Sequence, residues 1–167
     1  MQKLGGGKND DDLACVDLYG YGGVGTIGLH LSDVVSSCVS SDDNPNDFKC
    51  FNESVRALPK DIQSRLVYKQ KNAAIVVESE AALIQKSQVL IVDPPRKGFD
   101  IEVVDYLCNK GYKNMKLVVY VSCGFQAFQR DCNALTQSGK WKVEFAEGYL
   151  LFPGSDAIET LAFFVPA

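Results

Sequence analysis

The chain has 167 residues, of which 46% are hydrophobic and 23% charged, and this is typical of one globular domain. No apolar run approaches the roughly 20 residues that cross a bilayer, and the polar start does not resemble a signal peptide. We therefore expect an intracellular protein without a membrane span, in the cytoplasm, the nucleus or an organelle. The net charge of −4 suits an RNA-binding surface poorly, and six scattered cysteines with one histidine predict no metal site and no disulfide framework.

The predicted elements alternate between apolar β-branched runs and segments of helical periodicity, the pattern of a parallel α/β sheet. Residues 1–12 are expected to be a disordered leader, and residues 13–167 one domain. The strands are predicted at Ala14–Tyr19, Ser37–Ser41, Arg65–Gln70, Val89–Asp93, Lys116–Ser122, Lys142–Leu150 and Glu159–Val165. The helices are predicted at Thr26–Val35, Pro45–Leu58, Glu78–Ile84, Ile101–Lys110 and Gln126–Ser138. The last two strands follow each other without a helix, joined by a turn at Phe152–Ser155.

A glycine-rich segment ends the first strand and opens the first helix. Its Gly23-x-Gly25-x-x-Gly28 spacing matches the fingerprint of dinucleotide-binding turns, and Asp42 follows the second strand, where an acid can bind ribose hydroxyls. Asp17 lies at the end of the first strand, where the binding sites for a methyl donor without phosphate usually have an acid. The turn predicts an adenosyl cofactor, with NAD and S-adenosylmethionine both open at this point.

Two further strands bring chemistry to the same edge of the sheet. Asp93 ends an apolar strand and precedes two prolines, which force the chain out of the sheet. The next strand delivers Cys123 to that edge, with Gly124 leaving clearance. A helix that begins close to the sulfur would favour the nucleophilic thiolate. Trp141 is expected to pack rather than to stack a base, and His30 to be a surface or half-buried residue.

Four motifs in this order resemble those of the RNA 5-methyluridine (uracil-5-) methyltransferase family. The segments Asp17-Leu18-Tyr19 and Gly23-Val24-Gly25-Thr26 are similar to its DLYCGxGT, with two residues inserted. The family's DPPRxG is present unchanged at Asp93 to Gly98. Its YVSCNPxTLARDL resembles the run from Tyr120 to Cys132, and its FPxTxHxE resembles the run from Phe152 to Glu159. The resemblance covers nearly the whole chain from Cys15 onward.

The resemblance implies a class I methyltransferase fold, a seven-stranded and mostly parallel sheet with an antiparallel last strand. It also implies S-adenosylmethionine as cofactor and methylation of uridine C5 in a loop of tRNA or rRNA. Cys123 would be the nucleophile, Glu159 the base that removes the C5 proton, and Asp93 a residue beside both donor and target base. The cofactor would be held by Asp17, Tyr19, Gly23, Gly25, Asp42, Asn72 and Asp93, and RNA by Arg96, Lys97 and Phe125.

The chain departs from the family pattern at several positions. Gly124 and Phe125 replace Asn-Pro, Ala157 replaces a histidine, and Asn72 replaces an acid. The Cys-Gly-aromatic and Phe-Pro-Gly forms resemble a plant-type branch. The family's N-terminal RNA-binding barrel does not precede the motifs, so we expect that module in a missing N-terminal region. Two alternatives stay open: methyl transfer to another acceptor, and a silent paralogue that binds RNA or a protein without turnover.

Overall fold

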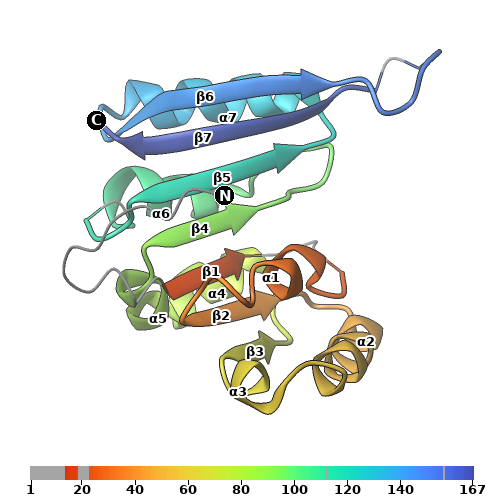
Figure 1. The fold of residues 1–167 in the computed structure, drawn as a ribbon. Helices are drawn as coiled ribbons and strands as arrows, with labels where there is room; N and C mark the ends of the chain where they lie inside the picture. The colour runs from red at the N-terminus through yellow and green to blue at the C-terminus, as the bar shows by residue number, and fades with distance from the viewer. Residues whose placement is uncertain (1–13, 19–22, 112, 156) are drawn as a thin grey trace, which may run out of the picture.

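The computed structural model describes residues 14–18, 23–111, 113–155 and 157–167. Its strands form one seven-stranded sheet in the order β3-β2-β1-β4-β5-β7-β6 (Figure 1). The first five strands pair in parallel, and β7 is inserted antiparallel between β5 and β6. The strands are β1 (Ala14–Leu18), β2 (Ser37–Ser41), β3 (Leu66–Lys69), β4 (Val89–Val92), β5 (Leu117–Ser122), β6 (Trp141–Tyr149) and β7 (Glu159–Pro166). The predicted sheet, with its antiparallel last strand, is confirmed.

The helices agree less closely with prediction than the strands do. In the described part of the chain they are α1 (Thr26–His30), α2 (Pro45–Arg56), α3 (Lys60–Gln63), α4 (Ala73–Ser79), α5 (Ala81–Lys86), α6 (Ile101–Asn109) and α7 (Phe125–Gln137). Pro45 occupies the first turn of α2, as expected, behind an Asn44 cap. The predicted single helix at 78–84 is wrong, because α4 and α5 are separate helices that meet at Glu80.

The core consists of two hydrophobic clusters on opposite faces of the sheet. Successive side chains of a strand point to opposite faces, so Leu90 and Val92 join one cluster and Ile91 joins the other. The first cluster lies under α4, α6 and α7, and α7 passes behind β6 and β7 in Figure 1. Trp141 is buried there and donates its indole N–H to the Leu107 carbonyl at 3.0 Å. It is a packing residue, as expected.

The strand ends that carry the predicted site residues lie at one edge of the sheet. The five parallel strands all finish at the same edge, and β7 begins there because it runs in the opposite direction (Figure 1). The ends of β2, β3, β4 and β5 therefore lie along the same edge of the sheet as the start of β7. No helix of the described residues has the length and apolar character needed to cross a bilayer.

Candidate active site

The glycine turn is anchored from two sides at Gly23. The Gly23 N–H donates to a carboxylate oxygen of Asp42 at 3.0 Å, and the Tyr68 hydroxyl donates to the Gly23 carbonyl at 3.1 Å. Gly23 and Gly25 have φ of +58° and +73°, left-handed values that favour glycine. A Cβ on Gly25 would also lie 2.7 Å from the ring of Phe51. Both glycines are thus required by the shape of this turn.

Asp42 follows β2, as predicted, and is buried at 4% exposure. Its second carboxylate oxygen accepts the N–H of Asn44 at 2.8 Å, so each oxygen holds one backbone donor. A carboxylate has about four lone-pair positions, which leaves acceptor capacity for ribose hydroxyls. The structure therefore gives Asp42 a structural task in addition to the predicted one.

The other predicted cofactor contacts are described to different extents. Asn72 caps α4, its side-chain oxygen accepting the N–H of Ile75 at 3.0 Å. This leaves its amide N–H₂ group for other partners. Asp17 pairs with Ser40 and Ile91 in the sheet through its backbone. Tyr19 lies outside the described residues, as do residues 1–12 of the expected leader.

Two carboxylates meet where β4 ends and β7 begins. Burial first, and the negative charge of Glu159 second, together raise the pKa of Asp93 from 3.8 to about 6. This coupling requires the two acids to lie close to each other. They come from residues 66 positions apart in sequence, and the sheet order brings them together. Sequence reasoning named both.

Cys123 lies beside this acidic pair. The register of β5 and β7 pairs Ser122 with Thr160, so its continuation by one residue brings Cys123 opposite Glu159. Cys123 is half-buried and lines a pocket of about 590 Å³ that also contains Arg96, Phe125, Ser155, Ala157 and Ile158. The helix α7 begins two residues later, at Phe125. A thiol, two carboxylates and a pocket thus share one end of the sheet.

The predicted RNA contacts surround the pocket. Phe125 is 52% exposed, and Arg96 is also exposed. The Lys97 ammonium contacts the Asp100 carboxylate at 2.6 Å, so its charge is partly compensated. Asp100 begins α6 without the predicted side-chain cap hydrogen bond.

The Arg96 backbone packs tightly against Gly124. A Cβ on Gly124 would lie 2.5 Å from the Arg96 carbonyl oxygen and 3.0 Å from its Cα. Gly124 has φ of −130°, so this space, and not backbone strain, is what requires glycine. The close approach explains why the chain carries glycine where the similar motif has asparagine.

The sequence analysis assigned no role to Arg130 and Asp131, although both belong to the motif from Tyr120 to Cys132. Asp131 is 1% exposed and accepts hydrogen bonds from the Phe99 N–H and the Tyr120 hydroxyl, both at 2.8 Å. Arg130 donates to Asp131 and to the Lys97 carbonyl. The sequence signal that could have indicated their role is the adjacent Arg-Asp pair in the helix that follows Cys123.

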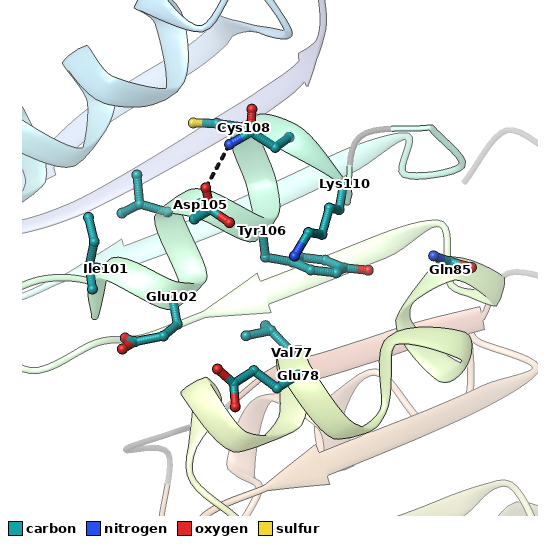
Figure 2. Close-up of a pocket in the computed structure, with 11 residues that line it drawn as sticks. Val77, Glu78, Gln85, Ile101, Glu102, Asp105, Tyr106, Cys108 and Lys110 are labelled. Carbon is teal, nitrogen blue, oxygen red and sulfur yellow. Dashed lines mark hydrogen bonds between the residues drawn. The ribbon is translucent and has the colours of Figure 1, made fainter.

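A second pocket of the described residues, larger than that at Cys123, lies elsewhere. Its volume is about 740 Å³, and it is lined by α6 together with Val77 and Glu78 of α4 and Gln85 of α5, as Figure 2 shows. It contains none of the predicted site residues, so volume alone does not identify the functional site. His30 is exposed, and no group of three or more metal-ligating side chains occurs in the described residues.

Comparisons with known proteins agree with this geometry. No family model matches the chain. An uncharacterized RNA methyltransferase of Protochlamydia amoebophila is 33% identical over 144 residues, which cover 86% of this chain and 36% of the relative. One from Leptospira interrogans is 28% identical, covering 86% and 34%. The chain therefore spans about a third of the length of these relatives.

Solved structures of methyltransferases share the fold. An rRNA methylase from Streptococcus thermophilus has a TM-score of 0.70 at 8% identity, covering 94% of this chain and 88% of that one. M. capricolum TrmK, solved with S-adenosyl-homocysteine, has a TM-score of 0.64 at 9% identity, covering 93% and 63%. The chain thus has the Rossmann-like fold of class I methyltransferases, and its relatives in sequence are RNA methyltransferases by name.

Proposed function

We propose that this chain is the catalytic domain of an S-adenosylmethionine-dependent RNA methyltransferase that acts on uridine C5. The observation that carries the proposal is that Cys123 lines a pocket at the same edge of the sheet as the carboxylates of Asp93 and Glu159, opposite Glu159 in the continued register of β5 and β7. The names of the relatives support RNA as the substrate. Four ordered motifs favour uracil-5 chemistry over other acceptors.

The residues present suit an adenosyl ligand. Left-handed glycines at 23 and 25 let the backbone turn without a Cβ, and Asp42 retains acceptor capacity. Asn72 has free amide hydrogens at the end of β3. The cofactor would supply a methyl group on a sulfonium. Gly23, Gly25, Asp42, Asn72 and Asp93 would hold it, together with Asp17 and Tyr19.

Uracil C5 is a weak nucleophile, and Cys123 would activate it. Its thiolate adds to C6, forming a sulfur–carbon bond and giving C5 the character of an enolate. Once C5 carries the methyl group, the Glu159 carboxylate accepts the C5 proton, the sulfur–C6 bond breaks and the thiolate is regenerated. Such chemistry needs the base outside its stack, so an RNA loop is the preferred substrate. Phe125, exposed at the pocket, would stack on it.

The test is covalent trapping with 5-fluorouridine RNA and S-adenosylmethionine. The fluorine cannot leave as a proton, so the Cys123 adduct persists and is seen by gel shift and mass spectrometry. Cys123→Ala should form no adduct and should retain cofactor affinity by calorimetry. Cys50→Ala, a change at an exposed cysteine on α2, is the matched control and should form adduct normally.

Glu159→Gln should accumulate a covalent complex with unmodified RNA, because elimination stalls. Cofactor binding without adduct would instead indicate methyl transfer to another acceptor. No cofactor binding at all would indicate a silent paralogue, which the acidic net charge of −4 favours. Unimpaired methylation by Cys123→Ala would overturn the proposed mechanism.

A further inference from the structure

The buried carboxylate of Asp131 gathers hydrogen bonds from three different segments. It accepts the Phe99 N–H at 2.8 Å, the Tyr120 hydroxyl at 2.8 Å, and Arg130 Nε and Nη2 at 2.9 and 2.7 Å. Phe99 lies in the β4–α6 loop, and Tyr120 lies in β5. Burial of a carboxylate is costly unless donors surround it, so the three segments are held together at this point.

Arg130 extends the connection to the middle of the loop. Its Nη2 donates to the Lys97 carbonyl at 2.9 Å. Gly98, next in the chain, has φ of +82°, and a Cβ there would collide with the Asp131 carboxylate and the Arg130 guanidinium. The loop backbone at 97–99 therefore rests directly on these two side chains.

The same loop touches the pocket at its other end. It begins at Asp93, and the Arg96 backbone lies against Gly124, the neighbour of Cys123. Both Cys123 and Arg96 line the pocket of about 590 Å³. A shift of residues 97–99 would consequently move Arg96 relative to Cys123, and Asp93 with it.

We propose that Arg130 and Asp131 are positioning residues, which fix the loop at 94–99 against Cys123 and Gly124 and so set the geometry of the reacting groups. This inference rests on the proposed function. Neither side chain lines the pocket, so both act through the loop. Arg130 is the better residue for testing this positioning role, because its side chain is 59% exposed and its replacement opens no cavity in the core.

The test compares rates of adduct formation with 5-fluorouridine RNA at saturating RNA and cofactor. Arg130→Met keeps the length of the side chain but removes every donor. We expect its rate to fall about 10- to 100-fold, as for a small misplacement of reacting groups. Its Tm should fall by several degrees, because one oxygen of the buried Asp131 carboxylate loses its donors. The rate is therefore compared well below that temperature, and the calorimetric affinity for S-adenosylmethionine should stay unchanged. Arg130→Lys, which can keep one of the two contacts, should recover part of the rate.

Two control variants lie on the same helix. Gln129→Ala changes an exposed neighbour and should leave both rate and Tm unchanged. Leu135→Val trims a fully buried core residue and should lower the Tm by about 3 °C, with the rate kept well below that temperature. Loss of stability alone therefore leaves the rate unchanged, whereas Arg130→Met should lower the rate under the same conditions.

Adduct formation by Arg130→Met at the wild-type rate would overturn the inference while leaving the proposed function standing. A loss of rate that only follows loss of folded protein would overturn it equally. If the wild-type chain itself forms no adduct, the proposed function fails, and the role of Arg130 and Asp131 in that reaction fails with it.

Discussion

At the scale of single residues, the environment of Asp93 changes how its carboxyl group ionises. Burial and the charge of Glu159 raise the pKa of its carboxyl to about 6. It is therefore mostly ionised at pH 7 but is protonated by mild acid, unlike an ordinary aspartate. The native state binds this proton more tightly than the unfolded chain does. Ionisation of Asp93 consequently destabilises the fold.

The loss of stability on ionisation of Asp93 can be tested with the variant Asp93→Asn. Between about pH 4 and pH 6 the native state carries more protons than the unfolded state, so the wild-type chain loses stability as pH rises through that window. The asparagine variant lacks this loss. Its Tm advantage over wild type should be small at pH 4, grow up to about pH 6 and stay constant above. Asp33→Asn, at an exposed position, should show no such growth, and a constant difference for Asp93→Asn would refute the assignment.

The strand pattern predicted Asp93 and Cys123 at one edge, because residues that end parallel strands share an edge whatever their spacing, and Glu159 was predicted from the family resemblance. Neither predicted that both oxygens of Asp42 hold backbone N–H groups, or that Asp131 holds Phe99. Those contacts join positions 19 and 32 residues apart. They depend on side-chain packing, which leaves no periodic signal in one sequence.

At the scale of elements, the strands and the helices α6 and α7 were predicted within one residue, whereas the other helices were not. The segment at 73–79 contains Ile75, Val76 and Val77, whose β-branched side chains disfavour helix. Burial of Val76 and Val77 in the core overrides that preference. The α4–α5 boundary is set by Glu80, which contacts the Lys71 ammonium at 2.7 Å. That hydrogen bond lowers the pKa of Glu80. The four-residue α3 is too short to show helical periodicity.

The junction between the β4–α6 loop and α7 provides a test at this scale. Gly124→Ala would bring a Cβ against the Arg96 backbone, which cannot move aside as a flexible side chain can. We expect it to cost about 1–3 kcal/mol in the free energy of unfolding, measured by urea denaturation. Adduct formation should slow as well, since Cys123 is the preceding residue.

Gly148→Ala is the matched control for this substitution. The added Cβ would meet only the γ2 methyl group of Ile158 at 3.2 Å, and this partly exposed side chain can shift where a backbone cannot. Its free energy of unfolding should stay within about 0.5 kcal/mol of wild type. Equal stability of the two variants would show that the Arg96 backbone yields to a side chain at 124.

The whole molecule combines a site that would handle RNA with an acidic surface. The net charge is −4, and two carboxylates lie next to the pocket. Of the basic side chains near the pocket, Arg96 lines it and Lys97 contacts Asp100. Affinity for nucleic acid comes largely from the neutralisation of phosphates, which releases counterions. This domain therefore offers few phosphate contacts, and its recognition of RNA would depend on the base in the pocket.

The salt dependence of binding tests this balance. With about two phosphates neutralised on single-stranded RNA, the slope of log K against log salt should be about −1.4, a loss of about sevenfold between 50 and 200 mM salt. Fluorescence anisotropy with a labelled uridine-rich loop would measure it. Arg96→Ala should make the slope shallower by about 0.7. Lys116→Ala, an exposed cation at the opposite edge of the sheet, should leave it unchanged. A slope of about −4 or steeper would mean that a broad basic surface contacts RNA, which the charge distribution around this pocket does not provide.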